Sequence, residues 1–313
     1  MTKEITLRMD NSQMRIDKWL ASQLADLSRN QIAHLIKSGM VKVEGKPNLK
    51  ARDVLEENSQ IQIDLEEIED DHSLKAQALS LDILYEDGDF LVINKPAGLA
   101  VHPGAGNRQN TLANGLLYYL GDDLSDISGF DRPGIVHRLD KGTGGLLLIC
   151  KNNEIHQAMA DLFKKHQVRR VYRALVWGQP DSNRGMIEAP LARHPKKRTE
   201  MAVVPDGKYA RSYYQIVRTF VNSQNKVQAS ELELTLYTGR THQLRVHLAY
   251  IHLPIIGDPV YHGGRPRLGL DNQALYSAEL AFKHPLNGQN MDFKIDAPGY
   301  YKEAEARLEE ALG

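Results

Sequence analysis

The sequence has a single cysteine, Cys150, which lies within an apolar stretch and cannot form an internal disulfide. A secreted domain stabilised by disulfides is therefore excluded, and Cys150 is expected to be a buried thiol in a reducing compartment. No apolar run approaches the ~20 residues that a membrane span needs. The first ten residues, MTKEITLRMD, lack the apolar core of a secretory signal. These absences predict a cytoplasmic protein.

The chain also lacks an excess of charge of either sign, because its formal net charge is only −1. The charge is distributed unevenly, with −5 over residues 64–76 and +8 over residues 151–220. Phosphate binding depends on local basic patches and not on the total charge. The second segment therefore predicts a surface that faces RNA. A solvated charged face is the alternative explanation for such a run.

The length of 313 residues permits one large and one small domain, and 42% hydrophobic and 25% charged residues are ordinary for a globular protein. We expect a small domain over residues 10–63, an acidic linker over 64–76 and a large domain over 77–313. Six carboxylates crowd into residues 64–71, where they repel one another and resist packing.

The small domain shows two helical patterns followed by two strands. Apolar residues recur at helical spacing over 16–24, and Ser28-Arg29-Asn30-Gln31 predicts a capping box for a second helix that ends at Gly39. Alternating apolar residues follow at 41–43 and 61–65. This order, in RIDKWLA and LSRNQIAHLIKSGMVKVEGK, resembles the S4 RNA-binding module. The resemblance implies phosphate contacts by Arg15, Lys18, Arg29, Lys37 and Lys42. The alternative is a small α+β domain with ordinary surface charge.

The large domain is expected to be of the α+β class, with a mixed, mainly antiparallel sheet flanked by helices. Its first strands form a hairpin with a turn near Asp87-Gly88. Further strands are predicted at 146–150, 171–177, 213–220, 230–237 and 291–296. Helices are predicted at 109–120, 154–165, 241–250 and 300–312.

The segment GIVHRLDKGTGGLLLICK, residues 134–151, is the most informative part of the chain. A single carboxylate, Asp140, precedes a Gly/Thr turn and the apolar strand 146–149. A carboxylate on a loop beside a strand, next to the basic side chain of Arg138, can be displayed as a nucleophile at the rim of a sheet.

This segment resembles the active-site motif of the pseudouridine synthases, in particular the branch that modifies the RNA of the large ribosomal subunit. Three further segments fit the same family in the same order: NKPAGLAVHPGAG at 94–106, QVRRVYRALVWG at 167–178 and LYTGRTHQLRVHLAYIHLPIIGDPVY at 236–261. The resemblance covers residues 10–300. It implies isomerisation of uridine to pseudouridine in RNA, a reaction that needs no cofactor because the atoms are only rearranged.

The resemblance also implies roles for individual residues. Asp140 is the catalytic carboxylate, and Arg240 is the arginine that pairs with it. Tyr172 packs against the target uracil and can transfer a proton, although a core tyrosine is the alternative. Arg138 fills the space left by a flipped nucleotide, and Leu244 forms an apolar wall. The sequence leaves open whether Asp140 attacks the sugar, attacks the base or removes a ribose proton.

Two basic or histidine-containing segments have alternative explanations. A proline-stiffened basic loop contains Arg193, Lys196, Lys197 and Arg198. This loop predicts an RNA contact, and a solvated loop is the alternative explanation.

Thr241 is expected to cap a helix that carries His242 and His247. Segment 94–106 is expected to form part of the pocket wall. The spacing of five between these histidines is wrong for metal ligands on one helical face, so no metal is expected.

The motif departs from the family pattern at Gly142, where an acidic or polar residue is more usual, and at Gly144, where Ser is more usual. Two glycines predict a looser loop, because glycine costs ordering entropy. The implied target is the stem-loop of 23S ribosomal RNA at the subunit interface, and other 23S or transfer RNA uridines remain alternatives. A non-catalytic RNA-binding assembly factor is a further alternative, whereas glycoside hydrolysis would require a second carboxylate. A monomer without an obligatory protein partner is the default expectation.

Overall fold

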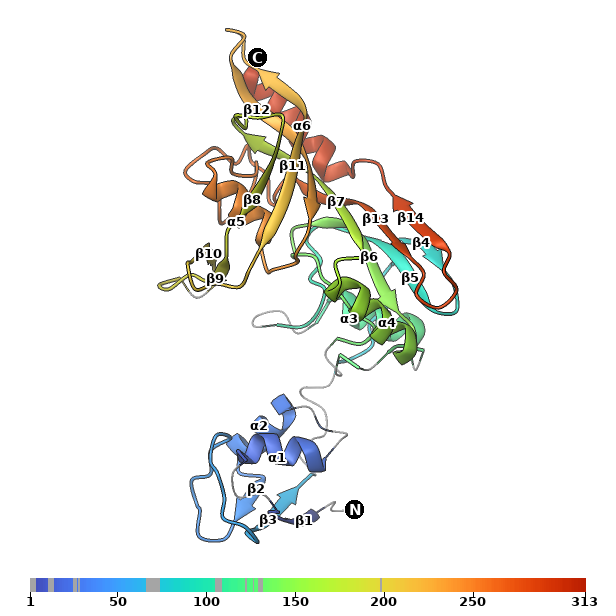
Figure 1. The fold of residues 1–313 in the computed structure, drawn as a ribbon, viewed down its shortest axis with the longest axis vertical. Helices are drawn as coiled ribbons and strands as arrows, with labels where there is room; N and C mark the ends of the chain where they lie inside the picture. Colours follow the sequence, from blue (N-terminus) through green and yellow to red (C-terminus); the bar gives the residue numbers. More distant parts are fainter. Residues whose placement is uncertain are drawn as a thin grey trace. The chain divides into compact units, whose positions relative to one another are not determined.

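The computed structural model describes residues 4–10, 14–24, 27, 29–65, 74–104, 109–121, 123–125, 127–128, 132–197 and 199–313. The chain divides into two compact units, Met1–Leu74 and Lys75–Gly313 (Figure 1). Most of the predicted acidic linker and the Ser28 end of the predicted capping box lie outside the described residues. No described helix has both the length and the apolar character that crossing a lipid bilayer would require.

The small unit packs two helices on a three-stranded antiparallel sheet. Its elements are β1 (Glu4–Arg8), α1 (Ile16–Gln23), α2 (Arg29–Ser38), β2 (Val41–Val43) and β3 (Gln60–Asp64). The order in the sheet is β1-β3-β2. Trp19 and Leu20 of α1 pack on Ile61 and Ile63 of β3, so the helical and alternating patterns meet in one core.

Two structural details of the small unit can be compared with the predictions made from the sequence. Gly39 ends α2 with φ of +80°, the left-handed conformation predicted for a glycine at this position. Strand β1 was not predicted, because it lies before residue 10 and only alternates between exposed and half-buried residues. It pairs with β3 and extends the small unit to the described part of the N-terminus.

The large unit is built on a sheet of nine strands in the order β4-β5-β6-β13-β7-β12-β11-β8, with β14 paired to β13. Only β6 and β13 are parallel neighbours among the described strand pairs, so the sheet is mixed and mainly antiparallel, as predicted. The strands are β4 (Ile83–Glu86), β5 (Phe90–Lys95), β6 (Gly144–Cys150), β7 (Arg169–Trp177), β8 (Arg184–Glu188), β11 (Arg211–Val221), β12 (Val227–Leu236), β13 (Leu275–Lys283) and β14 (Asn290–Lys294). A separate pair contains β9 (Leu191–Arg193) and β10 (Met201–Val203).

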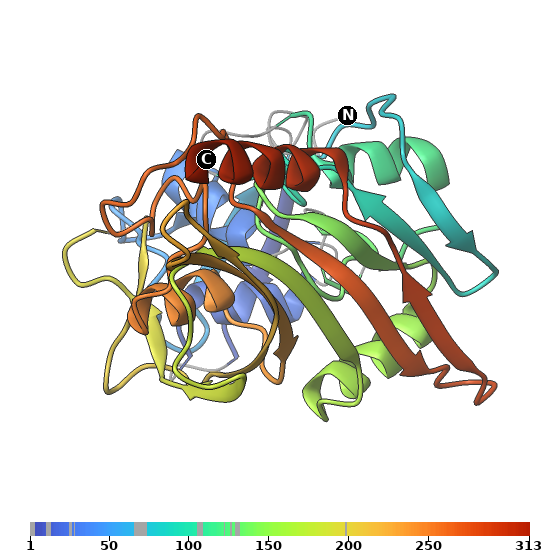
Figure 2. The same cartoon turned by 90° about the horizontal axis from the view of Figure 1, so that it is seen from above.

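The helices of the large unit occupy the predicted places. They are α3 (Leu112–Leu120), α4 (Asn153–Lys164), α5 (Gln243–Tyr250) and α6 (Gly299–Leu312). Figure 2 shows α6 along one side of the sheet and α4 on the other. Helix α4 packs Ile155 and Met159 against Leu146 and Leu148 of β6. Every residue of β6 is buried, and this rigid strand therefore supports the loop that precedes it.

Strand β13 lies in the middle of the sheet but was not predicted. Its sequence, LYSAELAFK, contains Ala, Glu and Leu, which favour helices, and it lacks a regular alternation. Its neighbours override this local preference, because β13 pairs with β6, β7 and β14. Strand β13 therefore joins the strand after Asp140 to the strand that carries Tyr172.

Candidate active site

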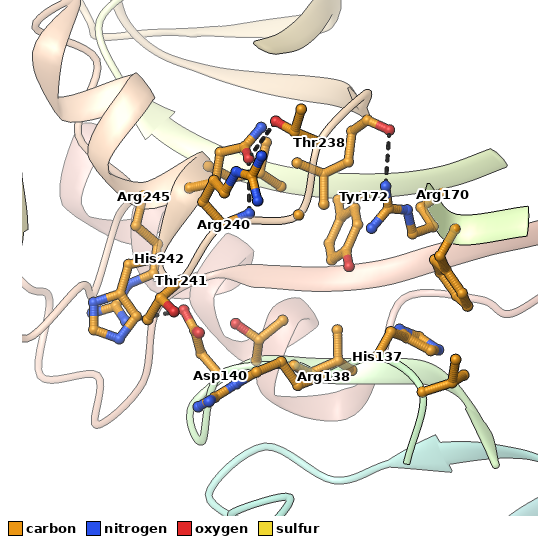
Figure 3. A pocket seen from close by; sticks show the side chains of 18 of the residues that line it. His137, Arg138, Asp140, Arg170, Tyr172, Thr238, Arg240, Thr241, His242 and Arg245 are labelled. Atoms are coloured by element: carbon orange, nitrogen blue, oxygen red, sulfur yellow. Dashed lines mark hydrogen bonds and ion pairs between the residues drawn. The ribbon is translucent and has the colours of Figure 1, made fainter. Parts of the chain in front are cut away.

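One pocket of the large unit gathers residues from the segments that carry the sequence motifs. It has a volume of about 510 Å³ and is lined by the segment around Asp140, by α4 and β7, and by the segment that leads into α5. Figure 3 shows the side chains of Asp140, Arg138 and Tyr172 converging in this pocket.

Asp140 lies at the turn before β6, as the sequence predicted. Its carbonyl accepts a hydrogen bond from the backbone N–H of Thr143 at 3.0 Å, which closes the turn. Gln273 fixes the far side of the turn by donating to the Thr143 hydroxyl at 2.9 Å. The Asp140 side chain retains 16% exposure, so its carboxylate is held in place while it stays accessible from the pocket.

The arginine that pairs with Asp140 is Arg245 and not the predicted Arg240. Arg245 Nη1 donates to Asp140 Oδ2 at 3.2 Å. The Arg240 side chain is exposed, and its Nε donates to the carbonyl of Tyr209 at 3.0 Å. Arg240 precedes α5 and bonds to Tyr209, whereas Arg245 lies in the first turn of α5, where Asp258 and Asp140 both reach its guanidinium.

The start of α5 is fixed by Gln243 and not by the predicted cap, Thr241. The Gln243 side chain accepts hydrogen bonds from the Thr238 hydroxyl at 2.7 Å and from the Arg240 backbone N–H at 2.9 Å. His242 occupies the N-cap position with φ of +55° and makes no side-chain capping bond. The turn therefore exposes Arg240 and directs Arg245 toward the pocket (Figure 3).

A second carboxylate, Asp258, anchors Arg245. Arg245 Nε and Nη2 donate to the two Asp258 oxygens at 2.7 and 2.9 Å, and the Asp258 side chain is fully buried. Burial alone would lower the pKa of Arg245, but the ion pairs with Asp258 and Asp140 raise it overall. Burial alone would raise the pKa of Asp258, but hydrogen bonds from Arg245 and two backbone N–H groups lower it overall. Arg245, Asp258 and Asp140 thus each lie beside a side chain of opposite charge.

Tyr172 and Arg170 extend from the same face of β7 into the pocket (Figure 3). Tyr172 is only 5% exposed, and burial raises the pKa of its hydroxyl, which therefore stays protonated near neutral pH. The Arg170 guanidinium lies 5.4 Å from the centre of the Phe163 ring and donates to the carbonyl of Tyr237 at 3.4 Å. Arg173, on the other face, pairs with Glu233 at 2.9 Å, in accord with strand alternation.

Lys95 has an unexpected place behind the Asp140 loop. Lys95 does not line the pocket; of segment 94–106, which was predicted to form part of the wall, His102 lines it. Lys95 is 1% exposed, and its Nζ donates to the carbonyls of Pro96, Leu99 and Lys141 at 2.8, 2.8 and 3.3 Å. Burial lowers the pKa of Lys95 to about 7, and the charge of Asp140 opposes this shift. The three carbonyl acceptors match the three N–H groups of the charged ammonium form.

Arg138 and Leu244 complete the pocket near Asp140. Arg138 is exposed and faces His102, with 3.4 Å between Arg138 Nη1 and His102 Nε2. Burial and the positive charges of Arg138 and Arg132 lower the pKa of His102 to about 4, so that imidazole is neutral at physiological pH. Leu244 is 5% exposed and lines the pocket as an apolar surface.

The histidines considered as a metal pair have other partners. His242 Nδ1 lies 2.8 Å from the Tyr261 hydroxyl. His247 lies between the Ser212 hydroxyl and the Ala189 carbonyl, at 3.0 Å from each. Their side chains therefore serve separate hydrogen-bond networks.

The predicted RNA contacts lie outside this pocket. In the small unit, Arg15, Lys18, Lys37 and Lys42 are exposed, and Arg15 also pairs with Asp17 at 2.8 Å. In the large unit, Arg193, Lys196 and Lys197 lie on or beside the connection between β9 and β10, and Lys197 pairs with Glu200 at 3.1 Å. The side chain of Arg29 and residue Arg198 lie outside what the structure describes.

Comparisons with known proteins agree with this arrangement. The family model for RNA pseudouridylate synthase matches residues 89–250, and the S4 domain model matches residues 14–61. "Ribosomal large subunit pseudouridine synthase D" of Zymomonas mobilis is 40% identical over 309 residues, covering 95% of this chain and 94% of that protein. "Uncharacterized RNA pseudouridine synthase YlyB" of Bacillus subtilis is also 40% identical, covering 94% of each chain.

A solved human structure has a similar fold. "Human RNA Pseudouridylate Synthase Domain Containing 1" aligns with a TM-score of 0.57 and 22% identity, covering 74% of this chain and 94% of that one. The pseudouridine synthase fold of the large unit is therefore supported by sequence and by structure.

Proposed function

Because this chain belongs to the RNA pseudouridylate synthase family and carries an S4 domain, we propose that it converts uridine to pseudouridine in 23S ribosomal RNA. The proposed target is the stem-loop at the subunit interface. Relatives named "Ribosomal large subunit pseudouridine synthase D" in Zymomonas mobilis and Escherichia coli, at 40% and 38% identity, support a ribosomal substrate.

The reaction breaks the bond between N1 of uracil and C1′ of ribose, turns the base, and joins C5 to C1′. The proton on C5 leaves and N1 takes one up, so atoms and charge balance without a redox partner. We assign Asp140 as the carboxylate that initiates this exchange. The observation that carries the assignment is its place within the pocket, 3.2 Å from the buried Arg245 cation.

Arg245 is suited to orient this carboxylate. Two of its nitrogens are held by Asp258, which leaves Nη1 directed at Asp140 Oδ2. A guanidinium held in this way needs no reorganisation when charge develops during the reaction. Arg240, at the pocket rim, is assigned to contact the RNA outside the target base, because its side chain is exposed there.

The remaining pocket residues suit a flipped pyrimidine. Tyr172 offers a buried ring and a protonated hydroxyl, so we assign it to pack on the uracil. Leu244 provides an apolar wall. Arg138 can stack in the space that the flipped nucleotide leaves, since a guanidinium plane stacks well on bases.

The basic residues predicted to contact RNA outside the pocket are assigned to the RNA backbone. They comprise Arg15, Lys18, Arg29, Lys37 and Lys42 of the small unit and Arg193, Lys196, Lys197 and Arg198 of the large unit. Each lysine or arginine that neutralises a phosphate should make binding more sensitive to salt.

The test is pseudouridine mapping of ribosomal RNA from cells that lack the gene, and from the same cells supplied with the wild-type or the Asp140→Asn protein. We expect positions in the 23S stem-loop to lose pseudouridine and to regain it only with the wild-type protein. If every ribosomal pseudouridine persists without the gene, the proposed substrate is wrong. If the Asp140→Asn protein restores the modification, the proposed catalytic role is wrong.

A further inference from the structure

Four flat side chains contact one another in succession beside the active-site pocket. The rings of His166 and Tyr237 are stacked, with 4.1 Å between their centres and 21° between their planes. The Arg211 guanidinium lies 5.2 Å from the centre of the Tyr237 ring and 5.5 Å from that of Tyr209. We refer to His166, Tyr237, Arg211 and Tyr209 as the rim stack.

Glu188 holds the distal end of the rim stack. Its Oε2 accepts hydrogen bonds from Arg211 Nε at 2.6 Å and from the Tyr209 hydroxyl at 3.0 Å. A surface arginine whose charge is balanced in this way is poorly suited to capture a phosphate. The Arg211 guanidinium instead contacts the rings of both Tyr237 and Tyr209. The stack is therefore ordered before any ligand binds.

The proximal end of the rim stack reaches the pocket. His166 is exposed and lines the pocket together with Lys164 and Arg170. Arg170 donates to the carbonyl of Tyr237 at 3.4 Å, which ties the stack to the strand that carries Tyr172. Tyr237 covers one face of the His166 ring, so the ring offers its other face at the rim.

The backbone at His166 fixes where this ring lies at the end of α4. The residue follows α4 with φ of +57°, a left-handed conformation at a helix end that glycine or asparagine adopts most easily. Its contact with Tyr237 is the interaction that the ring gains.

We propose that the His166 ring, supported by Tyr237, is a stacking site for the base of the RNA nucleotide next to the target uridine. This inference rests on the proposed function, since it assumes that a uridine enters the pocket. A base removed from its helix exposes its neighbour, and aromatic side chains stabilise such unstacked bases by stacking. The exposed Lys164 and Lys165 add positive charge beside this position.

The test measures RNA binding by the full-length protein. The probe is a synthetic RNA hairpin with one uridine in its loop, compared with hairpins that are abasic on the 5′ or the 3′ side of that uridine. We expect His166→Asn and Tyr237→Leu to raise Kd by about 5-fold to 150-fold, the range for loss of one stacked base. Asparagine tolerates the left-handed backbone, so His166→Asn removes the ring without straining the helix end.

Two controls separate stacking from other effects. Tyr237→Phe keeps the ring, and Tyr118→Leu alters a tyrosine that is 62% exposed on α3 and does not line the pocket. Both should bind within about twofold of the wild type if ring stacking is the relevant interaction. The wild type should bind one of the two abasic hairpins more weakly than the intact hairpin. The His166→Asn variant should bind that abasic hairpin and the intact hairpin with the same affinity.

Unchanged affinity in His166→Asn would overturn the inference. So would a loss of affinity accompanied by a weaker salt dependence, because that result indicates a phosphate contact. Pseudouridine formation is assayed separately on the same hairpins and on ribosomal RNA. If the wild type isomerises no uridine but the ring-dependent binding persists, the proposed function fails while the stacking site stands.

Discussion

Asp258 holds Arg245 by two hydrogen bonds, at 2.7 and 2.9 Å, and these bonds fix the direction of the one nitrogen that reaches Asp140. Asp140, the proposed catalytic carboxylate, is therefore oriented by a second carboxylate that does not line the pocket. Backbone N–H groups of Val260 and Tyr261 donate to the same Asp258 oxygen, at 2.8 and 2.9 Å, and hold Asp258 in turn.

Replacing Asp258 by Asn should impair both stability and catalysis. The change leaves Arg245 with less buried countercharge, and breaking a buried pair costs up to about 3–5 kcal/mol of unfolding free energy. A displaced Arg245 should also lower kcat by about 100-fold without a comparable change in RNA affinity. Urea unfolding and single-turnover assays measure the two effects. Glu233→Gln is the matched control, since its half-exposed pair with Arg173 should contribute no more than about 1 kcal/mol. Equal effects of the two variants would contradict the role of Asp258.

Arg245→Lys and Arg240→Lys should have very different effects on the reaction. Lysine cannot reproduce the two-point bond to Asp258, so Arg245→Lys should lose about 100-fold in kcat/KM. Arg240→Lys retains an exposed cation at the rim, and its loss should be at least about tenfold smaller. Measuring kcat/KM of both variants on the same RNA substrate shows which arginine the reaction depends on. A larger loss for Arg240→Lys would mean that the ion pair seen between Arg245 and Asp140 does not serve the reaction.

Lys95 should make stability depend on pH. Its pKa is about 7 in the folded chain and near 10.5 when unfolded, so between these values the unfolded chain binds more protons. Unfolding free energy should therefore rise with pH across this window, by at most about 5 kcal/mol from this group. Lys95→Met should flatten that slope and should lower stability, because three buried carbonyls lose their donor. Denaturant titrations from pH 6 to 10 give the slopes. Identical slopes for the two proteins would show that Lys95 does not titrate in this range.

Gly144→Ser should destabilise the protein, contrary to the view that glycine only loosens this loop. A Cβ at position 144 would lie 3.0 Å from the Lys95 carbonyl oxygen and 3.0 Å from the Tyr300 ring. Such overpacking typically costs about 1–3 kcal/mol. Gly88→Ala, where a Cβ meets no atom within 4 Å, is the control and should be neutral or slightly stabilising. A higher melting temperature for Gly144→Ser would instead mean that glycine at this position loosens the loop and lowers stability.

The sequence predicted the elements whose signals are local. The hairpin around Asp87-Gly88 and helices α3 to α6 appear where turn residues and periodicity placed them. The position of Asp140 at a turn before a buried strand was predicted as well. These features depend on neighbouring residues in the chain, which a sequence pattern records directly.

Features that depend on distant partners were not predictable in the same way. Arg240 and Arg245 are equivalent by composition, and the choice between them depends on Asp258, thirteen residues beyond Arg245. The burial of Lys95 depends on Lys141, forty-six residues away. The rim stack joins residues after α4 and β12 with others on and before β11.

Strand β13 has a consequence for the width of the pocket. It pairs with Gly144, just beyond Asp140, through Tyr276, and with Tyr172 through Ser277. The strand that follows Asp140 and the strand that carries Tyr172 are thus two interstrand spacings apart, or about 10 Å of backbone. This spacing contributes to the distance between the Asp140 turn and the Tyr172 side chain, which both line the pocket. A change confined to the irregular register of β13 near Ser277 could therefore alter which base fits, while every residue that touches the base stays the same.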